Sequence, residues 1–531
     1  MTETKAERIY RRRWWTLAVL SLSLLIVTID NTIVNVALPT LQGELSSTWS
    51  ELQWIVDAYI LVFAALLMTM GSLGDRLGRA HLLRAGLFIF GASSIGASFA
   101  DSAVQLTAAR AAMGVGGAMI FPATLAIITN VFPVNERGKA LGAWGAVVGA
   151  GIALGPILGG VLIEYTNWSW IFLINVPIVA VTLVLGRFFV PNSREANPRR
   201  QDVPGTLLSG AMLGVLVFGL IKGGEWGWSD PSVIGLIVGG VTCGIAFVAW
   251  ERHTSHPMMD MWLFRNPRFS SGIGTVTLLI LCQMGTIFAL TQYMQAVLGY
   301  SALETGIRFI PFAFGQVIGA SQSHRFVNRF GTNRVIFGAF MGFAAVAIGS
   351  SFWQSDTSFL IIGPMFFFWA FCMGSIMPSC SEAILGAVPM QRAGVGSATN
   401  SAAVQVGAAI GVASLGSILS TVYSSSIKSA VAALPAETGH MARDSIGEAL
   451  GVASTLNEIA GDTLASAARE SFMDGWQVMV FVTAGIAIAT GFIMLRLMPP
   501  RHLTPQQLEH AGIQPELWEM KPDNIESFNR E

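Results

Sequence analysis

The stretch WTLAVLSLSLLIVTIDNTIVNVALP, residues 15–39, decides the class of this protein. A helix needs roughly 20 consecutive, mostly apolar residues to cross a lipid bilayer, and this run is long enough. A signal peptide has an apolar region of only about 7–15 residues followed by an A-x-A cleavage site, and neither feature fits here. The run is therefore predicted to be a retained first membrane span.

The composition of the whole chain agrees with a membrane protein. Of the 531 residues, 53% are hydrophobic and only 12% are charged, whereas soluble domains carry about 25% charged residues. The formal net charge of -1 gives no information about partners. The four cysteines lie in apolar runs without a CxxC pair or a nearby histidine cluster, so we expect buried free thiols rather than a metal site.

Fourteen apolar runs are long enough to be membrane spans. They are bounded by charged and turn-forming residues. The predicted spans are 15–39, 53–72, 82–100, 104–128, 138–162, 169–190, 204–222, 231–250, 269–291, 303–323, 333–352, 357–382, 394–419 and 475–497.

The basic residues test this count, because cytoplasmic loops carry an excess of Lys and Arg. With an even number of spans and the N-terminus inside, 25 of the 31 basic residues fall on the cytoplasmic side. The opposite side has Lys222 and three residues of the segment 420–474, and Arg110 and Arg308 lie within spans. One missing or extra span would destroy this alternation, so both termini are predicted to be cytoplasmic.

A duplicated turn indicates an internal repeat. Residues 71–84 read GSLGDRLGRAHLLR and residues 328–334 read NRFGTNR, and both follow a span that runs from outside to inside. Secondary transporters are commonly built from repeated halves. We therefore predict an all-α membrane protein with two six-helix pseudo-repeat bundles and two inserted central helices.

The predicted organisation follows from this repeat. The longest polar segment is expected to form one or two amphipathic helices outside the membrane, and no GxxxxGK[ST] loop for ATP-driven transport is present. The predicted units are an N-terminal bundle 1–190, a linker with two extra spans 191–268, a C-terminal bundle 269–497 with the extracytoplasmic segment 420–474, and a cytoplasmic tail 498–531.

Several motifs resemble those of one transporter family. Residues 71–84 resemble motif A of the major facilitator superfamily, with Gly74 replacing an alanine and Ala80 replacing a basic residue. The chain as a whole resembles the fourteen-span drug:proton antiporters of that superfamily. The other stretches that carry the resemblance are IDNTIVNVALP (29–39), WIVDAYIL (54–61), LTAARAAMGVGGA (106–118), GAGIALGPILGG (149–160), WSWIFLINVP (168–177) and VPMQRAGVGSA (388–398).

Ionisable residues inside spans are costly and are therefore candidate functional residues. At 1.5 Å per residue, Asp30 lies roughly 22 Å from the cytoplasmic face, and Asp57 and Arg110 lie roughly 8 and 9 Å from the outer face. In a core about 30 Å thick these three residues share one level. We interpret them as a proton-coupling group: Arg110 keeps one carboxylate ionised, and desolvation favours the protonated form of the other. The alternative is that Arg110 merely neutralises buried acids; the resemblance implicates Asp30 and Arg110 in coupling.

Motif A has a conformational interpretation. Asp75 could accept hydrogen bonds at a helix N-terminus, and making or breaking that contact would bias inward-open against outward-open states. The alternative is a simple basic anchor with a glycine turn, and the resemblance implies the gating role. The candidate gating residues are Gly71, Asp75, Arg76, Gly78 and Arg79.

The fifth span is rich in glycine around a proline. Glycines four residues apart let two helix backbones approach closely, and Pro156 removes a backbone donor. The span is interpreted as a sealed, rocking interface that prevents proton leak, and ordinary close packing is compatible with it. The residues of this antiporter motif are Gly151, Gly155, Pro156, Gly159 and Gly160.

The C-terminal half offers no clear acid in mid-membrane. Gln316 and Asn400 stand where related pumps for dicationic compounds tend to carry acids, which puts dicationic substrates in doubt. Arg308 and Glu382 are expected to be interfacial rather than in the transport pathway.

The predicted function is export of amphipathic drugs or small metabolites across the cell inner membrane in exchange for protons. The expected partners are the small-molecule substrate, protons and the lipid bilayer, with no nucleic acid, cofactor or metal, and the chain is expected to act as a monomer. Alternatives are a transporter of another cargo (lipid, siderophore, amino acid or sugar) and a non-transporting scaffold or receptor. An enzyme is not expected, because no nucleophile–base set appears.

Overall fold

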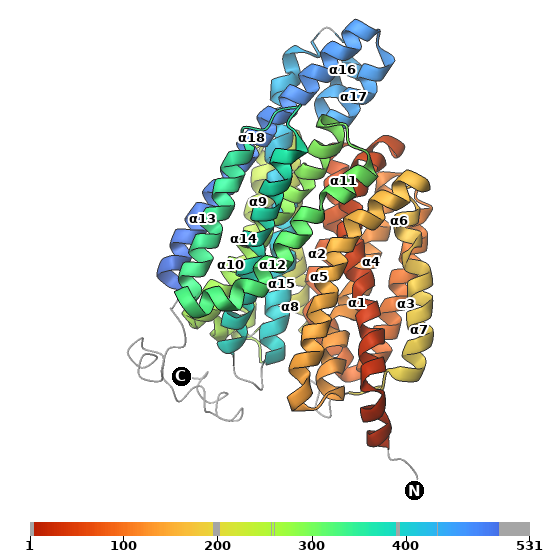
Figure 1. Cartoon of the computed structure of the whole chain (residues 1–531), viewed down its shortest axis with the longest axis vertical. Coiled ribbons are helices and arrows are strands. Elements are labelled where there is room, and N and C mark those ends of the chain that lie inside the picture. The colour runs from red at the N-terminus through yellow and green to blue at the C-terminus, as the bar shows by residue number, and fades with distance from the viewer. Residues whose placement is uncertain are drawn as a thin grey trace.

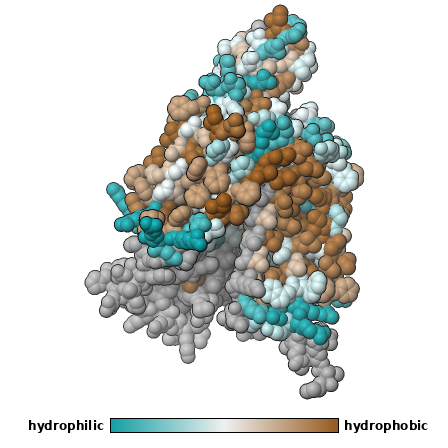
Figure 2. Space-filling model, viewed as in Figure 1, coloured by the Kyte–Doolittle hydropathy of each residue, from teal (hydrophilic) through white to brown (hydrophobic). Residues whose placement is uncertain are grey.

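The computed structural model describes residues 5–194, 202–255, 257–259, 261–388, 393–432 and 434–498. These residues form helices and contain no strand, and the long helices run side by side through the molecule (Figure 1). Apolar side chains cover much of the visible flank between two more polar ends (Figure 2). This distribution is the one that a bilayer-spanning bundle requires.

The N-terminal half contains five long helices and a sixth that is broken. The sixth predicted span is interrupted at Ile174, because Pro177 lacks the N–H that would bond the Leu173 carbonyl. The helices are α1 (Lys5–Glu44), α2 (Trp49–Leu77), α3 (Arg79–Ser98), α4 (Ala103–Val131), α5 (Val134–Tyr165), α6 (Trp170–Leu173) and α7 (Asn175–Phe189).

The inserted pair follows as α8 (Val203–Trp226) and α9 (Pro231–His253), which pack against each other. Both helices begin at an aspartate whose side chain accepts from a backbone N–H of the first turn, Asp202 for α8 and Asp230 for α9. A proline stands in the first turn of each helix, where its missing N–H costs nothing.

The C-terminal half repeats the six-helix plan. Its tenth predicted span is again interrupted, at Phe309, because Pro311 cannot donate to the Ile307 carbonyl. The elements are η1 (Met261–Arg265), α10 (Pro267–Gln292), the π-helical η2 (Tyr293–Val297), α11 (Ala302–Arg308), α12 (Ile310–Phe330), α13 (Thr332–Ser350), α14 (Phe359–Gly386), α15 (Ala393–Ser426), η4 (Ile427–Ser429), α16 (Ala436–Asp444), α17 (Ile446–Thr455) and α18 (Glu458–Leu497).

All fourteen predicted runs fall in helices, and the predicted fold class is confirmed. Twelve helices in the described part of the chain meet a length and hydropathy criterion for crossing a membrane. The other two predicted spans lie in α5, where several side chains are not described, and in α12, which is 21 residues long but more polar.

The two glycine turns that suggest an internal repeat have similar backbone conformations. Gly78 joins α2 to α3 with φ of +109°, and Gly331 joins α12 to α13 with φ of +85°. This left-handed region is strained for residues with a side chain, so glycine is needed at both turns.

The bundle has two distinct ends (Figure 1). We call the end where α1 begins and α18 ends the terminal end, and the opposite end, which carries α16 and α17, the capped end. These two short helices and the adjoining ends of α15 and α18 account for the predicted helical segment 420–474. Tyr423 of α15 fastens the cap by donating to the Ala442 carbonyl at 2.9 Å.

The four cysteines are free, as the sequence predicts. Cys282 and Cys380 are buried, and Cys243 and Cys372 are half-buried.

Candidate functional site

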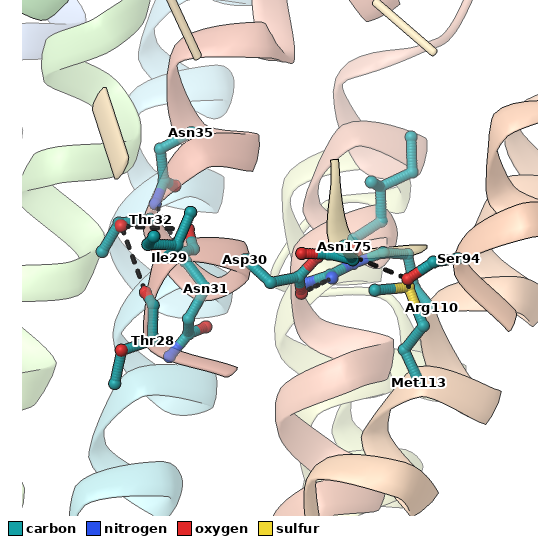
Figure 3. Close-up of polar contacts among 11 residues, drawn as sticks. Thr28, Ile29, Asp30, Asn31, Thr32, Asn35, Ser94, Arg110, Met113 and Asn175 are labelled. Atoms are coloured by element: carbon teal, nitrogen blue, oxygen red, sulfur yellow. Dashed lines mark hydrogen bonds and ion pairs between the residues drawn. The ribbon is translucent and has the colours of Figure 1, made fainter. Parts of the chain in front are cut away.

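The centre of the N-terminal half holds a buried ion pair between α1 and α4 (Figure 3). Arg110 donates through Nη1 to Asp30 Oδ2, and both side chains are buried. The two residues are 80 positions apart in the chain. The structure therefore brings together two of the three residues that depth alone placed at one level.

Arg110 also contacts two residues of α2. The Arg110 Nε donates to the Ile55 carbonyl of α2 at 3.2 Å, and the guanidinium lies 4.4 Å from the centre of the Tyr59 ring. Removing one member of such a buried pair would leave a charge uncompensated, which is costly in a low-dielectric interior.

Asn175, the first residue of α7, is a site residue that the sequence reasoning missed. Its Nδ2 donates to Asp30 Oδ1 at 3.2 Å and to Ser94 Oγ of α3 at 3.3 Å (Figure 3). Asn175 has no ionisable group, so the cost of burying a charge, which singles out Asp30, Asp57 and Arg110, does not single it out. The sequence nevertheless indicates Asn175, because it is the one amide side chain in the stretch WSWIFLINVP and lies within the sixth predicted span.

Asp57 bonds neither Asp30 nor Arg110. Its side chain is 0% exposed, and neither carboxylate oxygen has a hydrogen-bond partner. Gln53, one turn earlier on α2, donates to the Val412 and Ala413 carbonyls of α15 at 3.0 and 3.2 Å. Residues four apart lie on the same face of a helix, so Asp57 belongs to the side of α2 that meets the C-terminal half.

The motif A turn is closed by an internal ion pair. Arg79 donates to Asp75 Oδ1 through Nε at 2.9 Å, and its Nη2 lies 2.8 Å from the same oxygen. Its Nη1 donates to the Ala126 carbonyl of α4 at 3.3 Å. Arg79 is thus a partner of Asp75 in this conformation, and a bond from a helix N-terminus to Asp75 stays a prediction. Arg76 is exposed at the terminal end.

The glycines of motif A permit close contacts. A Cβ on Gly78 would lie 2.6 Å from Asn192 Oδ1, and one on Gly71 would lie 3.6 Å from Pro122 Cβ. Asn192 also accepts from the Ala80 N–H at 3.2 Å, which ties the turn to the chain after α7.

The glycines of α5 pack directly on α1. A Cβ on Gly151 would lie 2.2 Å from Thr28 Oγ1, one on Gly155 would lie 1.9 Å from Thr32 Oγ1, and one on Gly159 would lie 2.8 Å from Ile33 Cγ1. Thr28 and Thr32 lie on α1 beside Asp30 (Figure 3). The glycine face of α5 thus lies against the same segment of α1 that carries the buried acid.

The next residues of α5 contact the C-terminal half. A Cβ on Gly160 would lie 2.6 Å from the Ala302 carbonyl oxygen of α11, and one on Gly306 of α11 would lie 2.3 Å from the Pro156 carbonyl oxygen. Backbone meets backbone here without intervening side chains. Pro156 and Gly160 therefore form part of a contact between the two halves.

Other bonds between the halves lie towards the capped end. Trp49 donates through Nε1 to the Gly416 carbonyl at 3.1 Å and through its backbone N–H to Asp444 Oδ2 at 3.0 Å. Gln295 donates to the Val36 carbonyl at 2.8 Å, and Gln42 donates to Ser445 Oγ. The described hydrogen bonds that join α1 or α2 to the C-terminal half are thus concentrated at this end.

The C-terminal half contributes buried amides. The side-chain oxygens of Gln316 and Asn400 are buried without a hydrogen-bond partner. Arg308 pairs with Glu304 at 3.4 Å and lies 3.8 Å from the centre of the Tyr300 ring, outside the buried site. The Glu382 side chain lies outside the described residues.

The sequence matches one family over most of its length. Residues 20–412 match the Major Facilitator Superfamily. The chain is 35% identical to the multidrug efflux pump LfrA of Mycolicibacterium smegmatis, covering 91% of this chain and 96% of that protein. It is 30% identical to the tetracenomycin C resistance and export protein of Streptomyces glaucescens, covering 96% of each, and 34% identical to the methyl viologen resistance protein SmvA of Salmonella typhimurium, covering 87% and 93%.

Solved structures show the same fold at lower identity. A bacterial homolog of the human lysosomal transporter Spinster, inward-facing and unoccupied, matches with a TM-score of 0.63 at 17% identity, over 92% of this chain and 98% of that one. The inward-open xylose transporter XylE from E. coli matches with a TM-score of 0.57 at 15% identity, over 94% and 99%. The chain belongs to the Major Facilitator Superfamily, as the motifs of its sequence predict.

Proposed function

We propose that this protein exports amphipathic small molecules through the cell inner membrane in exchange for protons. The observation that carries the proposal is Asp57, a fully buried carboxylate with no partner for either oxygen. An isolated ionised carboxylate in a low-dielectric interior is very unfavourable, so Asp57 needs a positive charge or a proton. Alternate occupancy by a proton and a substrate supplies both needs.

The two acids of the site then have different tasks. Asp30 is neutralised by Arg110 and receives a further hydrogen bond from Asn175, so its ionised form is stabilised. Asp57 has neither contact and is the better proton carrier. Arg110 also bonds the Ile55 carbonyl, two residues before Asp57, and so couples the ion pair to the helix that carries Asp57.

The orientation follows from charge. The terminal end carries Arg76, Arg79 and Arg84 at the first turn and Arg252, Arg325 and Arg329 at later ones, and basic residues favour the cytoplasm. We place the terminal end in the cytoplasm and the capped end outside. The bonds between the halves at the capped end then close the outer side.

Motif A and the fifth span have conformational tasks in this scheme. The Asp75–Arg79 pair holds the turn at the cytoplasmic end, and exchange of partners at Asp75 would bias one state over the other. The packing of Gly151 and Gly155 on Thr28 and Thr32 leaves no room for water between α5 and α1, which would limit proton leak along this contact.

The substrate class rests on charge and on the relatives. Their names refer to tetracenomycin C, methyl viologen and several drugs, all small molecules. In this chain the N-terminal half has one buried acid without a partner, and the C-terminal half has buried amide oxygens without a partner, such as that of Gln316. This set fits a monocation or a neutral amphipathic compound that forms hydrogen bonds, whereas a dication would leave one charge without a partner.

The test is transport in proteoliposomes with an imposed pH gradient and a fluorescent monocation. Asp57→Asn should abolish gradient-driven export, and Asp57→Glu should retain part of it. Asp356→Asn, at an exposed position, is the matched control. Export by Asp57→Asn at the wild-type rate, or wild-type export that ignores a protonophore, would refute the mechanism.

A further inference from the structure

Two buried acids lie outside both six-helix bundles. Asp202 precedes α8, and Glu251 lies in the last turn of α9 at the terminal end. Their side chains are only 9% and 3% exposed. Neither residue belongs to a motif or to the coupling group described above.

One oxygen of each carboxylate accepts hydrogen bonds from the protein. Asp202 Oδ1 accepts from the Gly205 N–H at 2.9 Å and from Trp250 Nε1 at 2.8 Å. Glu251 Oε2 accepts from the Met259 N–H at 2.9 Å. The remaining oxygens, Asp202 Oδ2 and Glu251 Oε1, are buried and have no hydrogen-bond partner.

These two remaining oxygens both lie close to Gly205. A Cβ at this position would lie 2.5 Å from Asp202 Oδ2 and 2.6 Å from Glu251 Oε1. Both oxygens therefore point into the small space that the missing side chain leaves. Any larger residue at position 205 would push the two carboxyl groups apart.

No cation balances the two acids in the described part of the chain. The ion pairs found there include neither Asp202 nor Glu251. The neighbouring Arg252 is exposed, and His253 bonds the Ala249 carbonyl through Nδ1. Two ionised carboxylates at close range in a dry site repel each other, and this repulsion favours the protonated form of one of them.

We propose that Asp202 and Glu251 form a proton-binding site in which one proton is shared between Asp202 Oδ2 and Glu251 Oε1. The proton turns two mutually repelling acceptors into one hydrogen bond, as in carboxyl pairs that hold a single proton. A metal ion fits less well. Hard cations take six or more oxygen ligands, whereas these acids have two free oxygens, and the described residues contain no cluster of three or more acids, histidines or cysteines.

The shared proton fastens the two inserted helices to each other next to their contact with the transport bundle. It links the start of α8 to the end of α9, and Thr206, in the first turn of α8, bonds Thr69 of α2 at 2.6 Å. Loss of the proton would separate Asp202 from Glu251 and loosen this contact. The helix α2 leads into the motif A turn. A change in the protonation of this site at the terminal end would therefore be transmitted through α2 to that turn.

Infrared spectroscopy of the full-length protein in lipid bilayers tests the proposal directly. The wild type should show the C=O stretch of a protonated carboxyl that shifts in deuterated water and disappears as the pH is raised. Glu251→Gln should lose this band while keeping its fold, because the glutamine amide can donate to Asp202 as the protonated acid does. Glu470→Gln, at an exposed position on α18, is the control that should leave the band unchanged.

The outcomes separate the alternatives. A wild-type spectrum that Glu251→Gln leaves unchanged at every pH would overturn the proposal, as would stabilisation by added Na⁺ or Ca²⁺ that Glu251→Gln removes. If Glu251→Gln does not yield folded protein, Asp202→Asn serves instead and should shift the band by changing its acceptor. A protonated Asp57 would give a carboxyl band of its own, so the readout is the difference between the wild-type and Glu251→Gln spectra, from which Asp57 cancels. That difference does not depend on the proposed function.

Discussion

Substitution of Gly306 by alanine tests whether the contact between α5 and α11 closes the capped end. The added Cβ would lie 2.3 Å from the Pro156 carbonyl oxygen and 3.2 Å from Ile157 Cα. These are backbone atoms that cannot rotate away, so the two helices must separate. Overpacking of this kind costs about 1–3 kcal/mol. If the contact exists only in the state closed at this end, the closed-to-open ratio should fall about 5- to 150-fold.

Spin labels at Val104 and Leu360 would measure the change. Both side chains are well exposed, at 71% and 85%, and they begin α4 and α14 at the capped end, one in each half. Gly306→Ala should increase the population of long distances between the labels. Gly485→Ala is the matched control, because a Cβ there meets nothing within 4 Å. Unchanged distances in Gly306→Ala, with a normal melting temperature, would refute the assignment of this contact as a gate.

Three further predictions concern the buried polar groups and the cap. Arg110→Ala should destabilise the protein by about 3–5 kcal/mol by leaving the Asp30 charge unpaired, and adding Asp30→Asn should restore much of the loss in thermal unfolding. Asn175→Ala should cost about 1–3 kcal/mol, because Asp30 loses a buried donor, and an effect equal to that of an exposed Asn→Ala control would contradict this. Burial, Asp444 and Glu51 raise the pKa of Glu448 in the cap to about 7. A raised pKa in the folded state means that the stabilisation is full at low pH and is lost as the pH rises through about 7; hydrogen exchange of α16 and α17 should therefore increase across this range, and Glu448→Gln should remove the dependence.

The helical runs and the shared depth of Asp30 and Arg110 could be predicted because both depend on local quantities. Apolar run length fixes the helices, and the rise per residue fixes the depth of Asp30 and Arg110. Depth does not fix rotation about the helix axis. Arg110 meets α2 at the Ile55 carbonyl and not at Asp57, and only the packing of α2 against α4 and α15 decides this.

The remaining features depend on contacts between distant segments. Asn175 reaches Asp30 across 145 residues, and Gln42 reaches the cap across 403 residues. No periodicity or charge pattern encodes such pairs. The Asp202–Glu251 pair also could not be predicted from the sequence. The glycine at position 205 makes room for the two carboxyl groups only because α9 packs beside it.

The isolation of Asp57 has a consequence for the driving force of the proposed exchange. The carboxylate has one negative charge and no other partner among the described residues, so it can be neutralised by one proton or by one monocation. One-for-one exchange of a monocation for a proton moves no net charge, and only the pH gradient can drive it. Export of a neutral compound through the same site moves one positive charge inward per cycle, to which the membrane potential adds about 2.3 kcal/mol per 100 mV. A potential imposed at equal pH should therefore drive the export of neutral compounds but not that of monocations, and a second proton-carrying acid in the pathway would remove this difference.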